Sequence, residues 1–159
     1  DTEPSSTPSD TEPSSTPSRA KAYIQWYLTS TQTYNAGAST ILNTTSDIMA
    51  NISHDSSRGI ITLHRAGVYE IAYHMQVISP TTAGTAWAQV KCFLNNTSIL
   101  ISNEHEGQDT YYNNVLSGTM LIDAPINSKI YFQIQPSVTI QLNGGKNPMQ
   151  TWFSCKSID

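Results

Sequence analysis

The chain has 159 residues and a formal net charge of −4 at pH 7, because its acidic side chains outnumber Lys and Arg. The excess acid lies in the first eighteen residues, which hold four carboxylates and no base, so the rest of the chain is neutral overall. A neutral domain lacks the basic surface that nucleic acid or an anionic membrane needs, and no apolar run reaches the ~18 residues of a membrane span. We therefore expect no nucleic-acid partner and no membrane insertion.

Residues 1–18 consist of the nine residues DTEPSSTPS written twice without a substitution. Their side chains offer almost nothing to bury, so ordering the backbone has no compensation. The four prolines, Pro4, Pro8, Pro13 and Pro17, favour a locally extended chain that is neither helix nor central strand. We interpret residues 1–18 as a disordered Pro/Ser/Thr-rich stalk or linker and residues 19–159 as one folded head. A terminal tail, or an artefact of where the chain was cut, is the alternative.

From residue 22 onward, apolar residues recur at every second position, which is typical of half-buried strands. In chain order, the clearest runs are AYIQWYL at 22–28, GVYEIAYHMQV at 67–77, WAQVKCFL at 87–94 and KIYFQIQPSVTIQL at 129–142. Short segments rich in Gly, Pro, Asn and Ser separate the runs, and no ten-residue stretch has the pattern of a capped amphipathic helix. Many short strands joined by turns predict an all-β domain in which two sheets bury their inner faces, as a sandwich or jelly roll.

The stretch SRGIITLHRAGVYEIAYHMQV resembles the core of the C1q/tumour-necrosis-factor-like jelly-roll superfamily, with Gly59, Gly67 and Tyr69 at its turn and Gly-x-Tyr positions. A glycine lets the chain turn sharply between antiparallel strands, and the tyrosine is the first large inward side chain of the next strand. Later segments are similar to later elements of the same superfamily: VKCFLNNTSIL, SGTMLIDAPINSKIYFQI and TWFSCKSI.

The resemblance implies a ten-strand-type jelly-roll sandwich that assembles as a homotrimer, with aromatic residues of the strands packed along the threefold axis. Eight Tyr and three Trp also exceed what one small core needs, and exposed aromatic residues favour interfaces. We expect the following residues to anchor the core or the trimer: Trp26, Tyr69, Tyr73, Phe132 and Phe153.

The segment NEHEGQD holds Glu104, Glu106 and Asp109 in an expected loop, and carboxylate oxygens are ligands that calcium prefers. The spacing matches no known calcium loop, and a solvated polar loop gives the same composition. We therefore assign no cofactor, with calcium as the one candidate. His54, His64 and His74 have no cysteine or acid at ligand spacing, and we interpret them as surface residues.

Cys92 and Cys155 both fall at inward positions of expected strands. They either form a disulfide, if their strands are neighbours, or remain buried thiols that pack like small apolar residues. The sequence has no Gly-x-Ser-x-Gly motif, no Cys–His pair at a familiar spacing and no carboxylate pair on one strand. We therefore expect no enzymatic activity.

A repeat stalk followed by a chemically quiet head suggests a trimeric head domain of a stalked fibre or of a surface or spike protein, viral, phage or bacterial. We expect an extracellular protein, displayed on a virion or cell surface, that binds a cell-surface protein or glycan receptor with the avidity of three identical sites. Two alternatives stay open: a structural trimerisation or coat module with no ligand, and a secreted C1q/TNF-like ligand.

Overall fold

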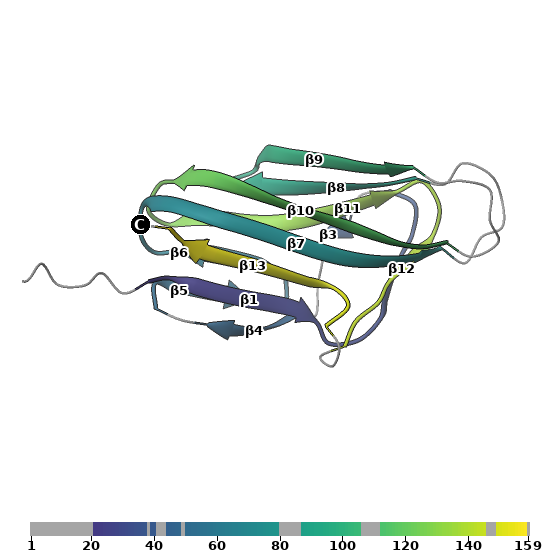
Figure 1. Cartoon of the computed structure of the whole chain (residues 1–159), viewed down its shortest axis with the longest axis horizontal. Helices are drawn as coiled ribbons and strands as arrows, with labels where there is room; N and C mark the ends of the chain where they lie inside the picture. The colour runs from purple at the N-terminus through teal and green to yellow at the C-terminus, as the bar shows by residue number, and fades with distance from the viewer. Residues whose placement is uncertain are drawn as a thin grey trace, which may run out of the picture.

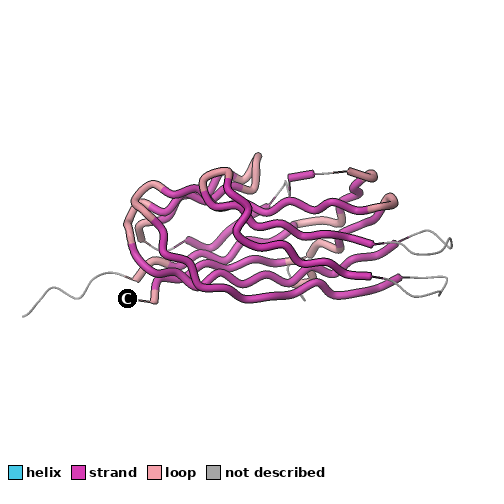
Figure 2. Tube along the Cα trace, turned by 90° about the horizontal axis from the view of Figure 1, so that it is seen from above, coloured by secondary structure: helices cyan, strands magenta, loops and turns pink. Residues whose placement is uncertain are grey.

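The computed structural model describes residues 21–37, 39–40, 44–48, 50–79, 87–105, 112–145 and 149–158, and every regular element within them is a β-strand. The strands pack in two layers (Figures 1 and 2). Residues 1–18, the predicted stalk, lie outside the described residues. The strands are β1 (Tyr23–Leu28), β2 (Gln32–Tyr34), β3 (Ser39–Thr40), β4 (Thr44–Ile48), β5 (Ile52–Asp55), β6 (Ile60–Leu63), β7 (Gly67–Ser79), β8 (Trp87–Leu94), β9 (Thr97–His105), β10 (Tyr112–Ala124), β11 (Ser128–Pro136), β12 (Ile140–Leu142) and β13 (Trp152–Ser157).

Two antiparallel sheets form the sandwich. Sheet A contains seven strands: β10, β7, β13, β1 and β4 lie side by side in that order, and β12 and β2 extend the sheet beside the second half of β7. Sheet B contains β5, β6, β11, β8 and β9 in that order, with β3 also paired to β11. The predicted all-β, two-sheet jelly roll is confirmed. The chain passes from sheet B to sheet A just after Pro136, the residue that cannot donate a ladder hydrogen bond.

The period of two in the sequence decides which side chains enter the core. On β7 the residues Tyr69, Ile71, Tyr73, Met75 and Val77 are all buried, while the residues between them are half-buried and face outward. Strands β8 and β11 show the same alternation. The inner faces of the two sheets therefore form one continuous apolar core, as expected of strands whose side chains alternate between faces.

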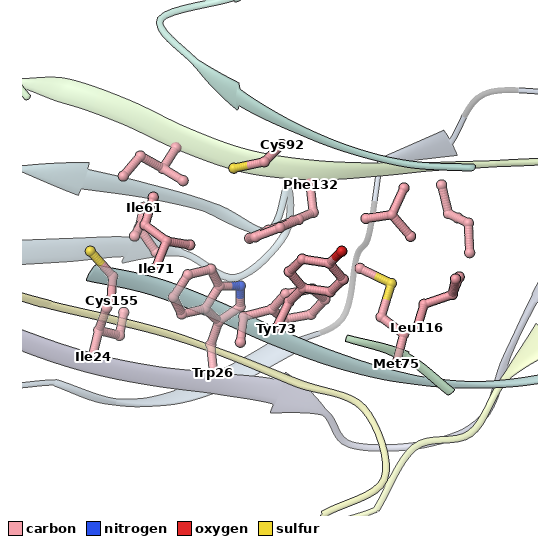
Figure 3. Packing of buried hydrophobic residues seen from close by; sticks show 14 of the residues in the cluster. Ile24, Trp26, Ile61, Ile71, Tyr73, Met75, Cys92, Leu116, Phe132 and Cys155 are labelled. Carbon is pink, nitrogen blue, oxygen red and sulfur yellow. The ribbon is translucent and has the colours of Figure 1, made fainter. Parts of the chain in front are cut away.

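Aromatic rings hold the centre of this core together (Figure 3). The rings of Trp26 and Phe153, both of sheet A, are stacked with centroids 5.4 Å apart, and Phe132 of sheet B lies 4.7 Å from Phe153. Tyr73 approaches Phe132 from β7, with 5.5 Å between the ring centroids. These offset and tilted contacts are the arrangements that aromatic pairs prefer, so the rings tie one sheet to the other.

The five aromatic residues expected to anchor the core or the trimer lie in the core of the protomer. Trp26, Tyr69, Tyr73, Phe132 and Phe153 are each at most 2% exposed, so all five rings are used inside the protomer. A side chain without solvent exposure has no surface to offer a second subunit. Any contact between subunits must use the outward positions of the strands instead.

Cys92 and Cys155 are both free and buried, and the disulfide left open by the sequence is not formed. Cys92 belongs to β8 of sheet B and Cys155 to β13 of sheet A, and the two sulfur atoms lie well apart in the core (Figure 3). Burial raises the pKa of each thiol to about 12. The residues act as small apolar side chains.

The two predicted turn glycines lie on either side of β6. Gly59 has a φ of 62°, the left-handed region that glycine adopts without steric cost, in the turn between β5 and β6. Gly67, with a φ of 156°, opens β7 opposite Ala124 of β10. Two residues later, the hydroxyl of Tyr69 donates a 2.8 Å hydrogen bond to the carbonyl of Arg65, which closes the turn between β6 and β7.

A third glycine is required by packing. A Cβ at Gly144 would fall on the backbone of Ser30, so the segment after β12 lies directly on the segment after β1. The amide of Gly145 donates a 2.9 Å hydrogen bond to the carbonyl of Leu28 at the same place. This contact fixes the corner where the chain passes from β12 to β13.

We expect neither thiol to react with a disulfide reagent in the folded protein at pH 8, because burial keeps both in the protonated form and away from the reagent. Ellman's reagent should release both thiols after denaturation. Rapid reaction of one thiol in the native protein would contradict the packing described for that cysteine.

We expect Gly144→Ala to lower the free energy of unfolding by roughly 1–3 kcal/mol, the usual cost of forcing a methyl group into a close backbone contact. Urea denaturation followed by tryptophan fluorescence measures this. Asn143→Ala is the matched control, because it removes only a 3.5 Å exposed contact with Thr31 and adds no atom. Equal stability of the two variants would show that the corner tolerates a side chain.

Candidate functional site

The sandwich has two different ends. β1 begins at Tyr23 and β13 ends at Ser157 at one end (Figure 1, left), which we call the proximal end because residues 1–20 join the head there. At the opposite, distal end lie the described segments 29–31, 35–37, 137–139, 143–145 and 149–151. None of these described distal residues is Asp, Glu, Lys or Arg, and most carry hydroxyl or amide groups or are glycine.

Hydrogen bonds between neighbouring segments order this end. The Thr31 hydroxyl contacts Asn143 Oδ1 at 3.5 Å and accepts from the Gly144 amide at 3.4 Å. In sheet B, where β8 and β11 are neighbours, the amide of Trp87 donates a 2.8 Å hydrogen bond to the Ser137 hydroxyl, and the Ser137 amide donates at 2.8 Å to the Trp87 carbonyl. The distal end therefore presents neutral hydroxyl and amide groups on a backbone held by the sandwich.

One candidate calcium ligand, Glu104, has its backbone at this same end, where it pairs with Ala88. The backbone of Glu104 belongs to β9, while Glu106 and Asp109 lie outside the described residues. Within the part of the chain that the structure describes, no three His, Cys, Asp or Glu side chains gather in a way that could hold a metal ion. Calcium binding by the NEHEGQD segment stays a prediction.

The outward face of sheet A carries most of the exposed apolar surface. Five large apolar side chains are exposed among the described residues, and four of them lie on this face or at its edge: Val68, Val115, Leu121 and Ile158. Leu121 is the most exposed of these, at 64%. Apolar side chains that gather on one face, rather than scatter, mark an interaction surface. We call this surface the sheet A face.

Aromatic rings and small residues make up the middle of the sheet A face. Trp152 of β13 is stacked on His74 of β7, with ring centroids 5.8 Å apart and planes at 5°. Tyr27 of β1 pairs with Trp152 on the other side. In the next cross-strand row toward the proximal end, β1, β13, β7 and β10 contribute Gln25, Ser154, Ala72 and Thr119.

A groove of about 490 Å³ crosses the proximal end of the sheet A face. Its walls include Lys21 and Tyr23 from the start of β1 and Ile158 from the residue after β13. Lys156 and Glu70, partners on the neighbouring strands β13 and β7, form an ion pair within the lining, with Nζ and Oε1 2.7 Å apart. The groove is apolar along its walls and has two ammonium groups against one carboxylate.

His54 departs from the surface role that the sequence suggested. It is half-buried between the sheets, where Nε2 lies 2.8 Å from the Thr44 hydroxyl and Nδ1 lies 2.9 Å from the Ser46 hydroxyl. These contacts join β5 of sheet B to β4 of sheet A at the edge of the sandwich. Burial lowers the pKa of His54, and the nearby Asp55 carboxylate opposes this in part. The sequence could have indicated this, because His54 lies two residues after Ile52 and alternating side chains of a strand place both on the inward face.

Sequence reasoning missed both surfaces. The distal end is assembled from five short segments far apart in the sequence, none with a motif of its own. The sheet A face was missed because the prediction of an interface rested on aromatic residues at inward positions of the strands. Leu121 interrupts the alternation of apolar and polar residues in β10, because it is apolar at an outward position. This was the signal available in the sequence.

Comparison with known proteins gives a fold and no sequence relative. No protein-family model matches the sequence, and no curated protein matches it. Murine APRIL has a similar structure, with a TM-score of 0.59 and 8% identity over 87% of this chain and 99% of that one. Eiger TNF from S. frugiperda gives 0.58 and 7%, over 89% of this chain and 94% of that one. The chain therefore has the C1q/TNF-like jelly-roll fold that the sequence resemblance predicted.

A search of the described residues for a helix that is long and apolar enough to cross a membrane finds none.

We expect the free energy of unfolding to fall as the pH drops below about 6.5, because the folded state holds the pKa of His54 below that of the unfolded chain. The unfolded state then binds the proton more readily, so this contribution is complete above pH 6.5 and is lost as the pH approaches the folded pKa. Urea denaturation between pH 7.5 and 5 measures the slope.

His54→Gln should flatten that slope, since an amide keeps hydrogen-bonding capacity without gaining a proton. His64→Gln is the control, because His64 is exposed and contacts Ser53 at the surface. A slope unchanged in His54→Gln would assign the acid sensitivity to another group.

Proposed function

We propose that this chain is the homotrimeric, receptor-binding head of a stalked extracellular protein. Residues 1–18 hold the head away from a surface, the sheet A face joins three copies, and the distal end meets the receptor. The observation that carries the proposal is the division of the surface: exposed apolar residues gather on one face, while the described connecting segments at the opposite end, 29–31, 35–37, 137–139, 143–145 and 149–151, carry neutral polar groups.

Trimerisation is supported by the fold and by the sheet A face. The C1q/TNF-like resemblance implies a homotrimer, and Val68, Val115 and Leu121 would be poorly placed on a free monomer. In an assembly with threefold symmetry, three proximal ends lie together, so three stalks can run in parallel. The three distal ends then face away from the stalks as one surface.

The distal end supports recognition by shape and hydrogen bonding. Its described side chains offer hydroxyl and amide groups that suit either a neutral sugar or a protein backbone, and no fixed charge that would select a charged ligand. Three copies of a weak site on one head raise the apparent affinity by avidity. The proposal includes no enzymatic activity, and it leaves a cell-surface protein and a glycan as the two receptor classes.

A secreted ligand is the second candidate. It is favoured by the structural likeness to murine APRIL and to Eiger TNF from S. frugiperda. The two functions differ in what the soluble trimer does. Added free to responsive cells, a secreted ligand triggers a response, whereas an attachment head makes beads adhere only when it is coupled to them through the N-terminal stalk.

We expect the full chain to run at about three times the monomer mass in size-exclusion chromatography with light scattering at pH 7.5. Glycan arrays and binding to cells from several kingdoms then test recognition, with the distal variant Asn35→Ala/Thr139→Ala as a probe and Ser53→Ala at the proximal end as its control. A monomeric wild type would overturn the proposal. A trimer that binds no cell or glycan would favour the structural coat module.

A further inference from the structure

The register of sheet A places Leu121 level with the groove. Strand pairing aligns Tyr23 of β1 with Lys156 of β13, Lys156 with Glu70 of β7, and Glu70 with Leu121 of β10. Three of these four residues line the groove, and the fourth is the most exposed apolar side chain among the described residues. Leu121 and the groove therefore occupy the same height along the strands, with Leu121 on the β10 edge beside Glu70 and the Tyr23 wall of the groove on the β1 side.

The next row toward the proximal end repeats this arrangement with charges. The amide of Ile158 bonds to the carbonyl of Val68, and Val68 pairs with Asp123 of β10. Lys21 precedes Tyr23 by two residues, so it lies in this row at the β1 side. Asp123 and Lys21 are both exposed, and the ion pairs found among the described residues involve neither of them.

Strand β10 forms one edge of sheet A, since β7 is its one partner among the described strands. A ring of three copies uses two different patches, because each subunit offers one patch to the next and receives a different one from the previous. The β10 edge carries a projecting apolar side chain, Leu121, and a carboxylate, Asp123. The β1–β13 side carries the groove and Lys21. The two patches are complementary in shape and in charge.

The positions of the two patches along the strands fix how two copies meet. If the three stalks run together, the symmetry axis follows the strand direction, and rotation about such an axis leaves the height of every residue unchanged. Leu121 enters the groove of the next copy only if both lie at one height, and the strand register meets this condition for both rows.

We propose that Leu121 of each protomer inserts into the groove of the next protomer, between Tyr23 and Ile158, and that Asp123 pairs there with Lys21. The occupant of the groove is thus a second copy of this chain, and the site is complete only in the assembly. This inference rests on the proposed trimer and names the contact that closes it.

The test uses the full chain and light scattering across a dilution series. Leu121→Ser should raise the midpoint concentration for dissociation of the trimer at least about tenfold, because an exposed apolar anchor of an interface is lost. Ile126→Ser is the matched control: Ile126 is 62% exposed, nearly the same as Leu121, but lies in the turn between β10 and β11. It should leave the midpoint unchanged, and circular dichroism should show that both variants stay folded.

Charge reversal gives an independent readout. Asp123→Lys and Lys21→Asp should each weaken the trimer about tenfold, because each places like charges opposite one another across the contact. The combined variant restores the opposite-charge pair in swapped order and should bring the midpoint back to within about threefold of the wild type.

The outcomes separate the two proposals. A wild type that is monomeric at all concentrations overturns the trimeric head itself. A wild type that is trimeric, with Leu121→Ser equal to Ile126→Ser and no rescue in the double charge variant, overturns only the proposed contact. In that case something other than β10 of a second copy fills the groove.

Discussion

The contact between Phe132 of sheet B and Phe153 of sheet A, with ring centroids 4.7 Å apart, is the interaction on which the rest of the structure depends. Trp26 and Tyr73 enclose this pair, so the centre of the core is filled by rings from both sheets. Since inward positions are fully occupied by this packing, they are closed to any partner. Whatever the protein binds must be met by the outward residues of the strands or by the two ends of the sandwich.

The jelly-roll topology then gives those remaining surfaces a direction. Both β1 and β13 have their outer ends at the proximal end, where Lys21, Lys156 and Glu70 are found. The segments that return the chain at the other end are uncharged in their described parts. A head that is attached at one end, and whose described connecting segments at the other end carry neutral polar groups, is suited to present the second end outward. The direction follows from the pairing of the first and last strands: β1 and β13 are antiparallel neighbours, so the start of one and the end of the other lie at the same end of the sandwich.

The fold was predictable from the sequence where a single periodicity operates. The alternation in 67–77 and 129–142 identified the inward side chains of β7 and β11, and the Gly-x-Tyr element at Gly67 and Tyr69 identified the jelly roll. The surfaces were not predictable in this way. The sequence alone does not show whether a tryptophan packs in the core or on an outer face. The structure places Trp26 in the core and Trp152 on the sheet A face.

Strand β10 shows why an assembly is the economical explanation of the sheet A face. It runs for thirteen residues and pairs with β7 alone among the described strands, and Val115 and Leu121 add apolar surface to this edge. A long apolar edge invites pairing with any strand, and natural proteins protect such edges with charges or cover them. On β10, Asp123 places a charge near the C-terminal end of the strand alone. A closed ring covers the whole edge with a fixed number of copies, whereas open-ended pairing adds copies without limit. One symmetry axis, parallel to the strands, therefore meets both conditions of the proposed trimer. It brings the three stalks together, and it places the β10 edge of each copy beside the groove of the next copy at the same position along the strands.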